Sequence, residues 1–140
     1  ISQLVELLLK REFAAVPAMY EEMRGRIERR ELPLADLAKS ENLNDSLDTY
    51  KRKLAAGTGR RSAAYELAIR SGRDYRAGDQ VTYYLTGEKK KVSVVDNAKL
   101  LSEAPADARD ENVAYYLNKL DELYANFREF LPAQKSPLGI

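Results

Sequence analysis

The 140-residue sequence contains no cysteine and no histidine. Without cysteine there is neither a disulfide framework nor a thiolate nucleophile. Without histidine, a Ser-His-Asp relay, a Cys-His pair and a His-ligated zinc site are all excluded. A hydrolytic enzyme built from this chain would therefore need paired carboxylates, or a metal ion held by them.

Long apolar runs are absent as well. The leucine run at Leu7–Leu9 is far shorter than the ~20 residues that cross a bilayer, so we expect no membrane partner. No secretory signal is visible, because Ile1 opens directly into an amphipathic pattern, and we expect an intracellular, cytoplasmic protein. Since the first residue is not Met, we also expect the chain to be part of a longer protein.

Charge is present in nearly equal amounts of each sign, but it is unevenly placed. The whole chain has 23 Lys and Arg against 22 Asp and Glu. Between Lys51 and Lys91 there are eleven basic residues and four acidic ones, a net charge of +7, whereas the remainder holds 12 and 18, a net charge of −6. A basic middle of this kind can attract a polyanion even though the total charge is +1.

Apolar spacing predicts mainly helices. A helical segment over residues 1–31 is interrupted at Pro17, where the missing N–H predicts a kink or a fresh start. Further helices are predicted over 46–55, with Asn44 or Asp45 as N-cap, over 61–71 and over 112–131.

A change to β-branched and aromatic residues predicts the β structure. Residues 80–86 read as a strand, Gly87 and Glu88 as a turn, and residues 91–95 as a second strand, which together give a hairpin over 79–95. A short helix over 96–103 is expected next. The predicted fold class is mainly α with a small β-hairpin, an α+β protein.

The densest acidic group is Asp107, Asp110 and Glu111. It lies in a polar loop just before a predicted helix, where carboxylates favour the positive end of the helix dipole. The alternating acids and central glycine of a calcium loop are absent. We therefore interpret this group as helix-start or solvated-loop chemistry, and we predict no catalytic and no metal-binding residue in this chain.

The segment Gly57–Ser62 precedes a predicted helix and contains Arg60 and Arg61. It is not a P-loop, because the terminal Gly-Lys-Ser/Thr and a preceding strand are missing. Free N–H groups at a helix start, a glycine and two arginines would nevertheless suit a phosphate. A flexible surface turn is an equally good interpretation.

Two other groups have alternative interpretations. The run Lys89, Lys90 and Lys91 is a solvated turn that discourages edge pairing, unless it faces the same way as Arg60 and Arg61. The tyrosines could stack on bases, although we favour a place in the core; they are Tyr83, Tyr84, Tyr115 and Tyr116.

The order of several motifs resembles the C-terminal part of family B DNA polymerases. In that family an acidic-Leu step, a leucine, a tyrosine-bearing helix and a glycine precede Gly-Asp-x-Val-x-Tyr, and a Tyr-Tyr-x-x-Lys-like run follows. The matching residues are Asp36-Leu37, Leu43, Tyr50, Gly72, Gly78-Asp79-Gln80-Val81-Thr82-Tyr83 and Tyr115 to Leu120. The resemblance covers about residues 30–130.

Two departures predict a divergent branch of the family, bacterial or phage. Glu41 stands where the family often has a basic residue, which removes one possible DNA contact. Gly59-Arg60-Arg61 stands where many members have Pro-His, which keeps or adds positive charge.

The resemblance implies a thumb-like helical domain over residues 32–131, a helical lead-in from the palm over 1–31 and a loose tail over 132–140. A thumb holds the primer–template duplex by backbone contacts, while the catalytic aspartates and their divalent metal, magnesium, lie in the palm. The implied partners are double-stranded primer–template DNA and the remainder of the polymerase, with no cofactor in this chain. The predicted DNA-backbone contacts are Lys51, Arg52, Arg60, Arg61, Lys89, Lys90 and Lys91.

A helical protein-interaction adaptor with no nucleic-acid role is the alternative. It explains the helices and the surface charge. It leaves unexplained the segregation of basic residues and the Gly-Asp-x-Val-x-Tyr strand.

Overall fold

A computed structural model describes residues 13–128, and these residues divide into two units. Within the described range, the first unit comprises 13–37, 88–90 and 113–128, and the second comprises 38–87 and 91–112. One division between the two units falls after Leu37, and the predicted boundary after residue 31 stays a prediction. The long C-terminal helix groups with the first unit, because it packs along another helix there.

The first unit begins with a 3-10 turn, η1 (Phe13–Ala15), and continues into helix α2 (Val16–Glu28). Pro17 lies in the first turn of α2. Backbone N–H groups in that turn have no acceptor inside the helix, so proline loses no hydrogen bond there, and its fixed φ suits the start of a helix. Pro17 therefore marks a fresh start. The predicted helix before it lies outside the described residues.

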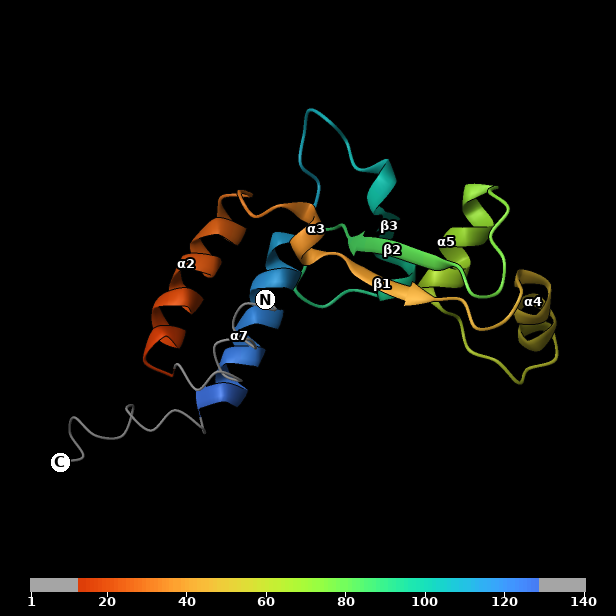
Figure 1. Cartoon of the computed structure of the whole chain (residues 1–140), viewed down its shortest axis with the longest axis horizontal. Coiled ribbons are helices and arrows are strands. Elements are labelled where there is room, and N and C mark those ends of the chain that lie inside the picture. The colour runs from red at the N-terminus through yellow and green to blue at the C-terminus, as the bar shows by residue number, and fades with distance from the viewer. Residues whose placement is uncertain (1–12, 129–140) are drawn as a thin grey trace. The chain divides into compact units, whose positions relative to one another are not determined.

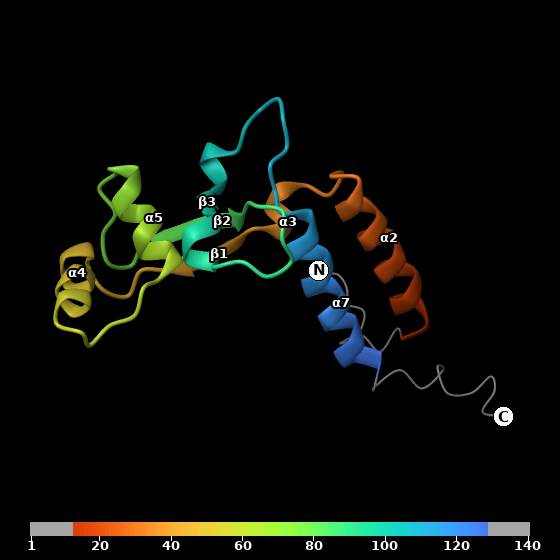
Figure 2. The ribbon, with the colours of Figure 1, turned by 180° about the vertical axis from the view of Figure 1, so that it is seen from behind.

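Helix α7 (Val113–Arg128) lies beside α2 in both views of the ribbon (Figures 1 and 2). The rings of Tyr20 and Tyr124 stack with centroids 3.9 Å apart. The Tyr20 hydroxyl donates to Asp121 Oδ1 at 2.6 Å, and Arg24 Nε donates to the same oxygen at 3.2 Å. Burial and the Asp121 carboxylate together raise the pKa of Tyr20. One carboxylate thus joins two residues of α2 to α7.

A three-stranded antiparallel sheet forms the centre of the second unit, in the order β1 (Lys39–Asn42), β2 (Gln80–Leu85) and β3 (Ala98–Leu100). The register places Tyr83 of β2 between Lys39 and Leu100. Val81, Leu85, Ala98 and Leu100 share one face by this register, and all four are buried. The short strands thus supply a continuous apolar layer.

Helix α5 (Ala63–Ser71) packs against β2 and β3. Its buried side chains are small or unbranched at Cβ, which lets the helix approach the sheet closely; they are Ala63, Ala64, Leu67 and Ala68. The helix ends at Gly72, whose φ of 71° is the left-handed conformation that glycine adopts readily. Helix α4 (Leu47–Ala55) packs against α5, and the short elements are α3 (Leu34–Leu37), α6 (Val94–Asn97) and η2 (Leu101–Glu103).

The hairpin predicted over 79–95 is wrong. Strand β2 forms, but residues 91–95 are not a strand, and β2 pairs instead with β1 and β3. Ser93 caps α6, because its Oγ accepts from Asp96 N and its carbonyl accepts from Asn97 Nδ2. Val94, expected to fill a strand face, is 38% exposed. The apparent alternation is therefore a loop followed by a helix start.

Two further details differ from expectation. The N-cap of α4 is Ser46, whose Oγ accepts from Thr49 N at 3.2 Å, rather than Asn44 or Asp45. The helix predicted over 96–103 is replaced by the end of α6, then β3, then η2. The fold class is confirmed as mainly α with a small β part, and that β part has three strands.

Gly87 follows β2 with a φ of 110°, and a Cβ there would lie 3.1 Å from Asn112 Nδ2 and 3.2 Å from Asn97 Oδ1. We expect Gly87→Ala to lower the free energy of unfolding by about 2–3 kcal/mol, through backbone strain and displacement of the two amides. Gly57→Ala is the matched control, because Gly57 also has a positive φ of 76° but has nothing within 4 Å of a new Cβ.

The control should lose about 1 kcal/mol, from backbone strain alone. Urea unfolding followed by circular dichroism measures both. Equal losses in the two variants would contradict the crowding inferred around Gly87.

Candidate nucleic-acid interface

Two tyrosines join α4 to α5. The rings of Tyr50 and Tyr65 stack with centroids 4.5 Å apart and 9° between their planes. The Tyr50 hydroxyl accepts from Ser62 N at 3.0 Å and donates to Glu66 Oε2 at 2.7 Å. The Tyr65 hydroxyl accepts from Asp45 N at 2.9 Å. The start of α5 and the start of α4 are thereby held in one geometry.

The connection between these helices closes back on α4. Thr58 N and Gly59 N both donate to the carbonyl of Lys53, at 3.0 and 3.2 Å. Gly59 approaches so closely that a Cβ there would lie 3.1 Å from Lys53 Cβ. Ser62 then enters α5 in an extended conformation, with no side-chain hydrogen bond capping the helix. The loop is therefore pinned at both ends, which argues against the flexible-turn interpretation.

Three of the predicted site residues are exposed cations without a carboxylate partner in the described part of the chain. Lys51 and Arg60 make no ion pair there, and the Arg52 guanidinium reaches only Thr49 Oγ1, at 3.5 Å. Tyr50 of the same helix points inward and is 6% exposed, so the neighbouring Lys51 and Arg52 point outward. Their charge is available to a ligand.

Arg61 differs from these three because it is already engaged. Its Nη2 lies 3.1 Å from Asp96 Oδ1 and 3.8 Å from Glu66 Oε1. A hydrogen bond from Ser93 and the Arg61 guanidinium lower the pKa of Asp96 below its ordinary value. Arg61 therefore ties α6 to the start of α5 as well as carrying charge.

The lysine run does not fall in one unit. Lys89 and Lys90 belong to the first unit, and Lys91 belongs to the second; all three are exposed. The second unit therefore holds Lys51, Arg52, Arg60, Arg61 and Lys91 of the predicted set. The first four are neighbours in sequence of Tyr50 or of Ser62, whose N–H donates to the Tyr50 hydroxyl.

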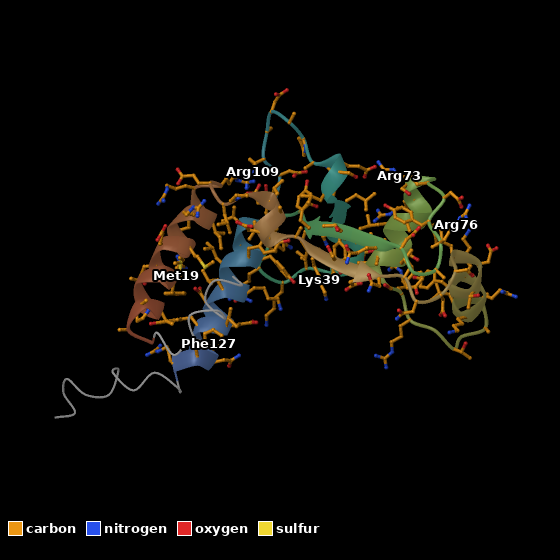
Figure 3. All side chains as sticks on the ribbon, in the orientation of Figure 1. Met19, Lys39, Arg73, Arg76, Arg109 and Phe127 are labelled. Atoms are coloured by element: carbon orange, nitrogen blue, oxygen red, sulfur yellow. The ribbon has the colours of Figure 1, made fainter. Side chains whose placement is uncertain are left out.

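A surface groove adds a residue that the sequence analysis did not select. It is lined by the first turn of α4 and by the segment 74–77, and it brings Lys51 and Arg76 to the same depression. Two carboxylates, Asp48 and Asp74, also line it. Arg76, which Figure 3 labels, pairs through Nη2 with Asp74 Oδ2 at 3.1 Å. The two side chains are 79% and 81% exposed, so this pair is readily exchanged for another ligand.

Arg76 could have been found from the sequence. It belongs to the basic stretch and lies two residues before the Gly-Asp-x-Val-x-Tyr motif. Nothing in the pattern indicated that it would line a groove with Lys51, which lies 25 residues earlier.

Two of the three grouped acids, Asp110 and Glu111, take part in structural contacts, whereas Asp107 is exposed. Asp110 accepts from the hydroxyl of buried Tyr84 and pairs with Lys99 Nζ at 2.8 Å. Glu111, 1% exposed, pairs with Arg109, which Figure 3 labels. Residues 13–128 hold no group of three or more potential metal-ligating side chains of the His, Cys, Asp and Glu types.

The tyrosines proposed as alternative base-stacking groups lie mainly in the core. Tyr83, Tyr84 and Tyr116 are 4%, 1% and 6% exposed. The Tyr83 hydroxyl donates to Glu41 Oε1 at 2.9 Å, and Glu41 also pairs with Lys39. Glu41, the acid at a position where family B polymerases often have a basic residue, thus has both of these partners within the second unit. Among the described helices none is long and apolar enough to cross a membrane.

Removing the Tyr50 hydroxyl tests the clamp between α4 and α5. Tyr50→Phe keeps the stacked ring but deprives Ser62 N of its acceptor and Glu66 of its donor, and should lower the free energy of unfolding by about 1–2 kcal/mol. Tyr65→Phe, which loses one hydrogen bond, is the control and should lose about half as much. Chemical denaturation measures both, and a smaller loss for Tyr50→Phe than for Tyr65→Phe would contradict the assignment.

Comparison with known proteins finds similarity to solved structures. No protein-family model matches the chain, and no curated protein matches it. Among solved structures, the chain is similar to the family B DNA polymerase of the hyperthermophilic archaeon Pyrobaculum calidifontis, with 25% sequence identity and a TM-score of 0.61. The match covers 90% of this chain but only 16% of the archaeal polymerase. The chain therefore has the fold of one part of a family B DNA polymerase.

Proposed function

We propose that this chain is the thumb of a DNA polymerase, which holds primer–template duplex by sequence-independent contacts to the phosphate backbone. The observation that carries the proposal is the similarity of nearly the whole chain to a small part of a family B DNA polymerase. The Gly78-Asp79-Gln80-Val81-Thr82-Tyr83 motif, on which the sequence resemblance rests, forms the turn into β2 and most of that strand.

The charges of the second unit support a grip on phosphates. Several carboxylates of this unit form ion pairs with cations of the same unit, such as Asp45 with Lys53 and Asp110 with Lys99. Lys51, Arg52 and Arg60 are left exposed with no such partner among the described residues. Contacts of Lys and Arg to phosphates supply affinity without reading sequence.

The catalytic step belongs, on this proposal, to the remainder of a longer polymerase. The palm of that protein would hold paired aspartates and a divalent ion, magnesium, and would be the second partner of this chain. A duplex-DNA partner also implies an intracellular, cytoplasmic protein, and the bacterial or phage branch stays a prediction. The adaptor alternative has no comparable support, because it does not account for the match to a polymerase fold.

Duplex binding tests the proposal. We expect the chain to bind a primer–template duplex weakly at 50 mM salt and to lose about a hundredfold in affinity by 200 mM, as about four phosphate contacts require. Lys51→Glu with Arg52→Glu should weaken binding about tenfold and reduce the slope of log affinity against log salt by about two. Arg60→Glu with Arg61→Glu should also weaken it. Fluorescence anisotropy with a labelled duplex measures each value.

Lys119→Glu with Arg128→Glu is the charge-matched control, since both residues are exposed on α7 in the first unit. This control should change affinity less than threefold, about 0.6 kcal/mol. No binding at low salt would refute a grip by the isolated chain. Equal losses in the control and in the α4 variant would show a general charge effect rather than a grip by the second unit.

A further inference from the structure

A second groove lies on the surface of the second unit, between the start of β2 and the end of β3. Its polar lining comes from Arg73, Tyr75, Gln80, Thr82 and Ser102, and Leu100 is part of its apolar lining. None of the seven predicted DNA-contact residues lines this groove, although it adjoins the groove of Lys51 and Arg76 through Tyr75, which lines both.

The lining of this groove carries positive charge and hydrogen-bond donors but no carboxylate. The amide of Gln80, the hydroxyls of Thr82 and Ser102, and the Arg73 guanidinium can all donate. Three acids are adjacent in sequence to lining residues, and none of them lines this groove. Asp74 and Glu103 line neighbouring grooves, and Asp79 Oδ2 accepts from Arg76 N at 2.8 Å. The groove is therefore complementary to an anion.

Arg73 has unused bonding capacity. Its Nη1 reaches Ser102 Oγ at 3.5 Å, which is at the limit of a hydrogen bond, and within residues 13–128 it makes no ion pair. A guanidinium presents five donors in a planar fork, which matches two oxygens of a phosphate. Arg76, by comparison, already has a carboxylate partner in Asp74. Figure 3 labels both arginines.

The backbone that carries Arg73 is fixed. Gly72 takes the left-handed conformation that ends α5, and Arg73 N then donates to Ser71 Oγ at 3.1 Å. Ser71 Oγ in turn donates to the carbonyl of Ala68 at 2.7 Å. On the sheet, Thr82 Oγ1 lies 2.7 Å from Ser40 Oγ, which orients that hydroxyl. Such preorganisation lowers the entropic cost of binding.

We propose that this groove binds a backbone phosphate of the DNA, with Arg73 as the main ligand and the hydroxyls of Thr82 and Ser102 beside it. The inference rests on the proposed function and adds a further phosphate-binding site to it. A groove on an open surface does not enclose most of a small ligand, as nucleotide pockets do, so the repeating phosphates of a long duplex suit it better than a free nucleotide.

The test uses the full 140-residue chain and labelled duplex DNA at 50 mM salt. Arg73→Ala should weaken binding about fivefold and lower the salt slope by about one. Arg73→Lys keeps the charge but loses the fork, and should still weaken binding about threefold. Thr82→Glu, which adds a carboxylate to the groove, should weaken it at least as much as Arg73→Ala.

Arg70→Ala is the control, because Arg70 is an exposed arginine three residues earlier that lines a different groove together with Glu103. It should change affinity less than twofold, about 0.4 kcal/mol. If Arg73→Ala and Arg70→Ala have equal effects while Lys51→Glu with Arg52→Glu still weakens binding, the groove is refuted and the grip stands. If the wild-type chain does not bind duplex, both fail.

A titration with inorganic pyrophosphate tells whether the groove prefers a DNA backbone phosphate or a free small anion. In a two-dimensional NMR titration, duplex DNA should shift the amide signals of Thr82 and Ser102 at lower concentrations than pyrophosphate does. Stronger shifts with pyrophosphate than with DNA would identify a small-anion site and overturn the backbone assignment.

Discussion

The stacking of Tyr50 on Tyr65, with the hydrogen bonds of their hydroxyls, sets the geometry on which the candidate interface depends. The Tyr50 hydroxyl fixes the backbone of Ser62 at the entry to α5. The backbone of Arg60 and Arg61, directly before Ser62, is therefore held in a defined position. Because Tyr50 points inward, its helical neighbours Lys51 and Arg52 face solvent. A neutral aromatic pair thus positions these cations without forming an ion pair with them. A carboxylate in its place would neutralise part of their charge.

The second unit separates two classes of cation. Arg61, Lys53, Lys99 and Arg109 are each matched to a carboxylate and hold elements together. Lys51, Arg60 and Arg73 have no such match among residues 13–128. The unmatched cations therefore join no two elements of the unit, and under the proposed function they are the charges left for DNA phosphates. Net charge alone, at +1, conceals this division.

Elements specified by local chemistry were predictable, and those specified by distant pairing were not. Gly72 at the end of α5, the inward alanines of α5, the strand β2 and the helix α7 all follow from nearby residues. The partners of β2 do not. β1 is a charged segment, Lys-Ser-Glu-Asn, about 40 residues earlier in the chain, and its strand conformation comes from pairing rather than propensity. Likewise, no local pattern shows that Arg76 shares a groove with Lys51 or that Arg73 faces Ser102, since segments from different parts of the chain line both grooves.

The first unit is assembled from stretches that flank most of the second unit in sequence, and its bond between Tyr20 and Asp121 joins residues 101 positions apart. For a disordered connection of that length, closing the chain costs about 4 kcal/mol of entropy. Once the second unit has folded, most of that connection is already ordered, and the cost falls. The order of folding is thereby biased: the inserted unit forms first, and α2 and α7 meet afterwards. During synthesis α2 is made about 100 residues before the Asp121 that it binds on α7, so its apolar face stays open to water or to a chaperone until α7 has been made.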